Sequence, residues 1–146
     1  MKVLLAAALA LSMTGGLLSD DTTLGAGVKL KDATPIPFIV KAPQDYVGKT
    51  VRIDGIATAV CEEMGCWMAV SDSERAGAPT VRLKVEHDGA IVFPMSAKGK
   101  KVSAQGTFEA IGGADAHGRE AASEHAKQDS QASSAFQIKA TGAVIR

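Results

Sequence analysis

Short runs in which apolar and polar residues alternate constrain the fold of this 146-residue chain more than any other feature. The clearest run is Val-Arg-Leu-Lys-Val-Glu at positions 81–86, which places three apolar side chains on one face of a strand and three charged ones on the other. Less regular alternation predicts further strands at 51–61, 66–71, 101–111 and 136–144. The sequence therefore predicts five short strands.

Five short strands with few helical segments predict a mainly β domain with one or two short helices, built as a small five-stranded OB-like barrel. A closed barrel leaves no exposed sheet edge, which favours it for a small domain, and a β-sandwich is the alternative. Short helical turns are expected near Pro35 and at 42–48. A longer helix is expected at 114–129, between the fourth and fifth strands, whereas an OB-like barrel usually carries its helix after the third.

The N-terminus predicts export. Lys2 is followed by an apolar run of about eleven residues, which is typical of a secretory signal peptide and too short to span a bilayer. We assign residues 1–19 to this peptide, with cleavage between 16 and 23, residues 20–34 to a lead-in with an edge strand at 28–30, and residues 35–146 to a single domain. The mature chain is expected to be soluble and periplasmic or secreted.

The charge balance excludes two classes of partner. Lys plus Arg and Asp plus Glu number 16 each, so the chain has no net charge with which to neutralise nucleic acid phosphates. It also has no polybasic segment for a membrane surface once the signal peptide is removed. A metal ion or another periplasmic protein remains as the expected partner. The common nucleotide-binding, zinc-hydrolase, serine-hydrolase and haem-attachment motifs are absent from the sequence, which favours a protein that is not an enzyme.

The chemically distinctive segment is the pair Cys61 and Cys66, separated by Glu-Glu-Met-Gly. Two strands joined by these four residues form a hairpin in which Gly65 takes a left-handed conformation. In such a hairpin the cysteines lie opposite each other on the ladder, and cross-strand neighbours are close enough for a disulfide. The same arrangement places both sulfurs on one side, as a metal site with two thiolates requires.

Three interpretations of this pair remain open. The first is a structural disulfide in an oxidising compartment, although so short a loop gains little from it, about 1–2 kcal/mol. The second is a soft-metal site for copper first and zinc next. The third is a redox-active thiol pair, although the spacing is not Cys-x-x-Cys. The candidate metal ligands are Cys61, Cys66, His125, Met64 and Met68.

Other residues near the pair have simpler expected roles. Met64 and Met68 are expected to pack unless a metal recruits their thioethers, and Met95 reaches a metal site only if its loop folds over the hairpin. His125 is expected on a narrow apolar helix face, where a hydrogen-bonded core histidine is an equally good interpretation. Trp67, the only tryptophan, either packs at the rim of the barrel or presents a binding surface.

The residues around the pair carry a resemblance. Gly-x-x-Thr-x-Val-Cys61-x-x-Met-Gly-Cys66-Trp67-Met68, preceded by Tyr46-Val-Gly-Lys-Thr-Val and followed by Gly99-Lys-Lys-Val-x-x-x-Gly106, resembles a family of small exported bacterial proteins classed only as a domain of unknown function. The resemblance runs from about Gly25 to the C-terminus. It implies an exported domain without an established activity, and it supplies no catalytic residues.

Together these observations predict an exported, soluble binding or accessory domain whose cysteine pair binds a soft metal ion. The alternative is a module that binds a protein, a peptide or a saccharide on one barrel face and uses Cys61–Cys66 purely as a structural disulfide.

Overall fold

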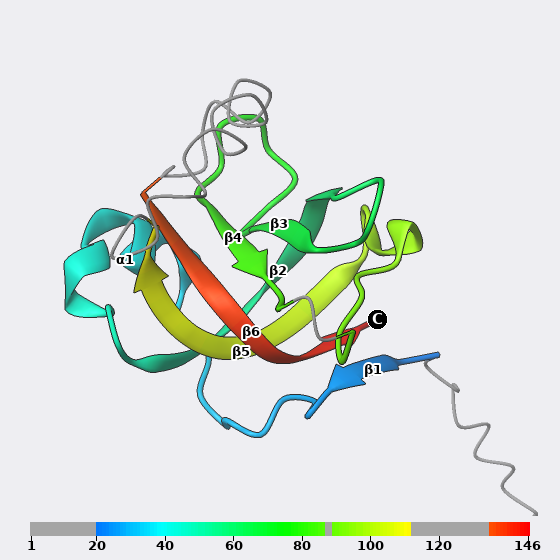
Figure 1. Ribbon diagram of the computed structural model, residues 1–146. Coiled ribbons are helices and arrows are strands. Elements are labelled where there is room, and N and C mark those ends of the chain that lie inside the picture. Colours follow the sequence, from blue (N-terminus) through cyan, green and yellow to red (C-terminus); the bar gives the residue numbers. More distant parts are fainter. Residues whose placement is uncertain (1–19, 87–88, 112–134) are drawn as a thin grey trace, which may run out of the picture.

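The computed structural model describes residues 20–86, 89–111 and 135–146 (Figure 1). These residues contain six strands, one α-helix and two short 3-10 helices, which are joined by loops. In chain order they are β1 (Thr22–Gly25), α1 (Ile36–Lys41), η1 (Pro43–Asp45), β2 (Thr50–Val60), β3 (Trp67–Ser71), β4 (Thr80–Lys84), η2 (Met95–Ala97), β5 (Lys101–Ala110) and β6 (Phe136–Ile145).

Strands β2 to β6 form a closed barrel. The sheet order is β1-β6-β4-β3-β2-β5, and an additional pairing of β5 with β6 closes the ring. Every neighbouring pair is antiparallel except β4 and β6, which are parallel over a short stretch. The prediction of a small five-stranded OB-like barrel is confirmed, and closure of the ring rules out the β-sandwich. Strand β1 is an addition that pairs with the C-terminal half of β6.

The barrel interior is filled by aliphatic side chains and two phenylalanines, Phe93 and Phe108. The alternation predicted at 81–86 holds, because Val81, Leu83 and Val85 are buried. Strand β2 departs from its predicted alternation. A β-bulge between Ala57 and Ala59 shifts the register against β3, so that Val60 rather than Ala59 is buried. This bulge sets the orientation of the chain just before Cys61.

The N-terminal lead-in differs from its prediction. The edge strand lies at Thr22–Gly25, not at 28–30. The chain leaves the ladder after Gly25, and the backbone amides of Lys29 and Leu30 donate to the side-chain oxygen of Gln105 instead of to a neighbouring strand. The buried side chain of Gln105 therefore accepts the hydrogen bonds that a neighbouring strand would otherwise accept. The predicted turns near Pro35 and at 42–48 are confirmed as α1 and η1.

Two sequence predictions lie outside the described residues: the signal peptide at 1–19 and the helix at 114–129. The long connection from β4 to β5 contains the short 3-10 helix η2 and no α-helix in its described part. Over the described ranges, no helix has the length and apolar character needed to cross a membrane.

Candidate functional site: the Cys61–Cys66 loop

The two cysteines lie in the connection between β2 and β3. The ladder ends with the pair Val60 and Met68, and the backbone N–H of Cys61 donates to the carbonyl of Trp67 at 3.0 Å. The loop therefore spans six residues, 61–66, instead of the expected four. The prediction that the cysteines face each other as ladder partners is wrong, because the position opposite Cys61 is taken by Trp67.

The sulfur atoms nevertheless lie together, as the hairpin prediction required. Cys66 donates its S–H to the sulfur of Cys61, with 3.2 Å between the two sulfur atoms. Both cysteines are partly exposed, so solvent, a metal ion or another thiol has access to them. The loop brings them together by an internal turn, in which the N–H of Gly65 donates to the carbonyl of Cys61 at 3.1 Å.

A second segment fixes this loop. The backbone N–H of Phe93 donates to the carbonyl of Gly65 at 3.0 Å, and the Phe93 ring is buried in the core. Gly65 is itself buried and has φ of +58°. A Cβ atom there would lie 2.4 Å from the carbonyl oxygen of Phe93. Only glycine permits both this backbone conformation and the close approach of the Phe93 carbonyl. Position 65 therefore requires glycine for packing as well as for the turn.

Hydrogen bonds stabilise the thiolate form of Cys61. Partial burial raises the pKa of this thiol, but hydrogen bonds from the backbone of Met64, Cys66 and Glu63 and from the S–H of Cys66 outweigh burial and lower the pKa to about 7. Donors aimed at a sulfur favour its charged form because they offset the negative charge. An appreciable fraction of Cys61 is therefore a thiolate at neutral pH, and the thiolate is the form that binds metals and attacks disulfides.

Cys66 has the opposite character. Burial raises the pKa of this thiol, and its hydrogen bond to Cys61 and the negative charge on Cys61 raise it further. The positive charge of Arg82 acts in the other direction but does not prevail. The two sulfurs therefore lie side by side in different electrostatic environments, and the Cys61 thiol is the more acidic of the two.

The remaining predicted ligands are placed as follows. Met64 lies in the loop itself and is 63% exposed, whereas Met68 is fully buried in the barrel core on β3. Met68 therefore has the packing role that its residue type favours, and we no longer count it among the groups available to an incoming metal ion. His125 lies outside the described residues. Within the described part of the chain, no group of three or more His, Cys, Asp or Glu side chains is placed to hold a metal ion.

Trp67 stands next to the pair at the start of β3 and is partly exposed. The guanidinium of Arg82 on β4 lies over its ring, 5.2 Å from the centroid. This cation–π contact holds the indole against the outside of the barrel, while Met68 and Val70 point inward. The side chain therefore packs at the rim and keeps an exposed edge near the cysteines.

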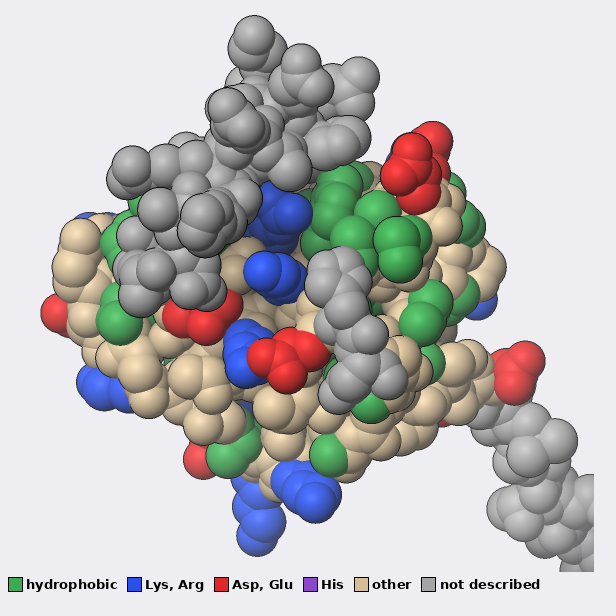
Figure 2. Space-filling view, in the orientation of Figure 1, with side chains coloured by type: hydrophobic (Ala, Val, Ile, Leu, Met, Phe, Trp, Pro, Cys, Tyr) green, Lys and Arg blue, Asp and Glu red, His purple; other side chains and the backbone are tan. Residues whose placement is uncertain are grey.

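Exposed apolar side chains lie in the loop and in the segment that is hydrogen-bonded to it. Met64 belongs to the loop, and Val92 and Met95, 54% and 47% exposed, belong to the segment that Phe93 anchors against it. We call these three residues the apolar rim. The loop and this segment lie at the same end of the barrel (Figure 1), where Figure 2 shows hydrophobic side chains next to a group of acidic ones. The hydrogen bond from Phe93 to Gly65 joins these two segments, and such a long-range contact leaves no local pattern in the sequence.

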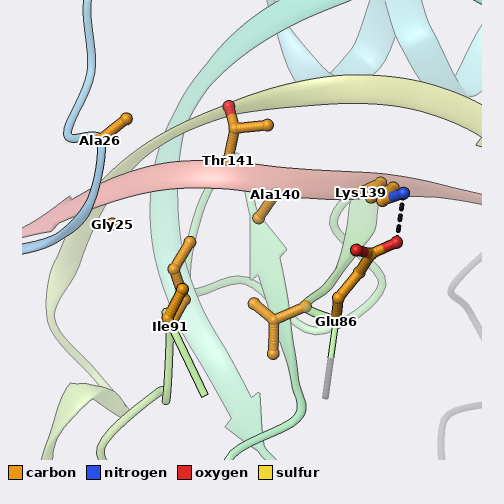
Figure 3. Close-up of a pocket in the computed structure, with 9 residues that line it drawn as sticks. Gly25, Ala26, Glu86, Ile91, Lys139, Ala140 and Thr141 are labelled. Carbon is orange, nitrogen blue, oxygen red and sulfur yellow. Dashed lines mark ion pairs between the residues drawn. The ribbon is translucent and has the colours of Figure 1, made fainter. Parts of the chain in front are cut away.

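A pocket of about 340 Å³ lies elsewhere, between β1, β6 and the segment that follows β4. Its polar part is the ion pair of Glu86 with Lys139, and Ile91 and Ala140 contribute to its apolar part (Figure 3). Its described lining contains none of the predicted site residues. The cysteine loop therefore remains the candidate site.

Fold and site together define a small OB-like barrel with two neighbouring cysteines in one hairpin loop. No family model and no curated protein matches the chain. An OBody bound to hen egg-white lysozyme is similar in structure, with 16% identity and a TM-score of 0.48, over 82% of this chain and 96% of the other. A protein assigned as an aspartyl-tRNA synthetase from Leishmania major Friedlin is similar over 82% of this chain and 22% of its own, with 16% identity and a TM-score of 0.47.

Proposed function

We propose that this protein is an exported binding module in which Cys61 and Cys66 together bind one soft metal ion, with copper(I) preferred to zinc. The observation that carries the proposal is the pair of partly exposed sulfur atoms 3.2 Å apart, one of which has a pKa of about 7. A thiolate already present at neutral pH lowers the proton competition that a metal ion must overcome. Export rests on the signal peptide indicated by residues 1–19.

The choice of copper(I) over zinc follows from the number and softness of the donors. Structural zinc sites are closed by four ligands, whereas the described residues supply two sulfurs at this place and no third His, Cys, Asp or Glu. Thiolate and thioether donors select copper(I), and Met64 in the loop adds an exposed thioether beside the two cysteines. A zinc site would need imidazoles such as His125.

A structural disulfide is the second candidate, and the sulfur separation favours it. A disulfide bond is about 2.05 Å long, so the two sulfur atoms need to approach by little more than 1 Å. In an oxidising compartment this bond forms readily. The protein would then act as an interaction module, with the apolar rim and Trp67 as the surface for a protein, peptide or saccharide.

Metal content and free thiols, measured on one sample of the full chain expressed with export, separate these candidates. We expect one copper per chain after loading with copper(I) under reducing conditions. We expect none in Cys61→Ser or Cys66→Ser, since each removes one of the two sulfur ligands. Glu62→Gln is the matched control, because it changes an exposed side chain of the same loop without touching sulfur, and it should keep the copper.

Two results would count against the metal site. The first is a chain that has no free thiols as isolated and that, once it has been fully reduced, still takes up no copper. This result supports the structural disulfide. The second is copper that remains bound in both cysteine variants, which places the metal elsewhere on the chain.

A further inference from the structure

The outer surface of β3, β4 and β6 carries a row of basic side chains. Leu83 of β4 points into the core, so Arg82 and Lys84 on either side of it face outward. Trp67 of β3 lies opposite Lys84 on one side, and Lys139 of β6 lies opposite it on the other. We call Trp67, Arg82, Lys84 and Lys139 the basic face. Figure 2 shows Lys and Arg side chains in a row next to hydrophobic ones.

The guanidinium of Arg82 is held in place but lacks an acceptor. On the ladder Arg82 lies opposite Ala69, and so small a neighbour leaves room for the guanidinium to reach diagonally across to Trp67, 5.2 Å from the ring centroid. The Nε atom of Arg82 is buried, yet it donates no hydrogen bond to any described residue. A guanidinium N–H without an acceptor is costly, and a carboxylate is an acceptor that matches its geometry.

The basic face has a local excess of positive charge, although the chain as a whole has none. Lys139 forms an ion pair with Glu86. Arg82 and the exposed Lys84 form no ion pair with a carboxylate of the described ranges. These two cations lie two positions apart on one face of β4, about 7 Å along the strand. An anionic ligand is therefore the partner whose charge complements this face.

We propose that the basic face binds an acidic oligosaccharide, whose sugar rings carry carboxylate groups. One carboxylate accepts hydrogen bonds from the guanidinium of Arg82, the next pairs with the ammonium of Lys84, and a sugar ring lies against the exposed edge of Trp67. The face uses neither sulfur atom. This binding therefore does not depend on whether the cysteine pair holds a metal ion or forms a disulfide.

Two features of the face favour a saccharide over other acidic polymers. Strands β3, β4 and β6 each pair with neighbours on both sides, so the face has no free strand edge to which an extended peptide could add. Its single indole, partly covered by a guanidinium, offers no series of aromatic rings on which successive nucleic acid bases could stack. A saccharide needs neither feature, because its charged groups and one ring suffice for contact.

The test titrates the full-length chain with tri-galacturonate in metal-free buffer of low ionic strength. Calorimetry measures the affinity, and fluorescence reports the place of binding, because Trp67 is the only tryptophan in the chain. We expect saturable binding that changes the fluorescence of Trp67 and weakens as salt is added. The methyl ester of the same trisaccharide keeps the rings without the charges, and it should not bind.

Variants of the two cations test the assigned contacts. Arg82→Gln should weaken binding by about tenfold, because it removes hydrogen bonds between charged groups. Lys84→Gln should weaken it by about threefold, since this side chain is exposed, and its removal disturbs no packed group. Thermal unfolding checks that Arg82→Gln is folded, because this change also removes the contact with Trp67. Lys41→Gln is the matched control, since it removes an equal charge from an exposed side chain of α1 and should bind as the unmodified chain does.

Four results would overturn the proposal. The first is no binding of tri-galacturonate at millimolar concentration, and the second is equal binding of its methyl ester, which would show that the charges are not recognised. The third is a tri-glutamate peptide that binds as tightly as the saccharide. The fourth is full affinity in both Arg82→Gln and Lys84→Gln, which would place the ligand elsewhere. Copper content is measured separately, so loss of the proposed metal site leaves these results unchanged.

Discussion

Replacement of Gly65 by alanine is expected to destabilise the protein by about 3 kcal/mol, more than a change of one methyl group normally does. Two costs add. A non-glycine residue at φ of +58° loses roughly 1–3 kcal/mol. The new Cβ would also lie 2.4 Å from the carbonyl oxygen of Phe93 and 2.9 Å from the Val92 side chain, so the hairpin and the 92–93 segment must separate. A urea titration of the reduced chain measures the change.

Gly99→Ala is the matched control, because Gly99 also has positive φ, +83°, but its Cβ would meet no heavy atom within 4 Å. We expect this control to lose only about 1 kcal/mol, the cost of the backbone conformation. If Gly65→Ala is no more destabilising than Gly99→Ala, the close contact between the cysteine loop and the Phe93 segment is refuted.

Truncation of Met68 to alanine is expected to cost about 2–5 kcal/mol of stability, since a fully buried side chain in the barrel core leaves a cavity. Met64→Ala should change stability by less than about 0.5 kcal/mol, because the Met64 side chain is 63% exposed. Two methionines that look equivalent in the sequence thus differ strongly in their contribution to folding. Thermal or urea unfolding of both variants measures the contrast.

Met68→Leu keeps the volume of the side chain and removes its sulfur, so the variant should fold and bind copper(I) as the unmodified chain does. Loss of copper from a folded Met68→Leu protein would restore Met68 as a ligand and contradict its assignment to the core.

The fold was predictable from the sequence because the alternation of apolar and polar residues along a strand shows which side chains are buried. Val81, Leu83 and Val85 alternate with charged residues and point into the barrel, so the pattern and the structure agree. The edge strand was placed wrongly because the pairing of β1 depends on β6, more than a hundred residues away, and because a buried glutamine side chain accepts the hydrogen bonds of the amides at 29–30. Neither contact leaves a local pattern.

The site was predictable in part. The nearness of the two sulfurs followed from the short spacing, but the β-bulge at Ala57–Ala59 and the six-residue loop have no local sequence signal. The difference between Cys61 and Cys66 depends on the direction in which the loop amides point, and spacing alone does not give that direction. The contribution of Val92 and Met95 depends on one long-range hydrogen bond from Phe93.

The proposed metal site rests on two sulfur atoms that lie together, of which that of Cys61 ionises near neutral pH. Absorbance of the thiolate, followed through a pH titration of the metal-free, reduced chain, tests this arrangement most directly. We predict that one sulfur ionises with a midpoint near pH 7 and the other above 9, and that Cys61→Ser removes the lower transition. A single transition near 9 for both sulfurs would contradict the account, because the loop amides would then give Cys61 no special character.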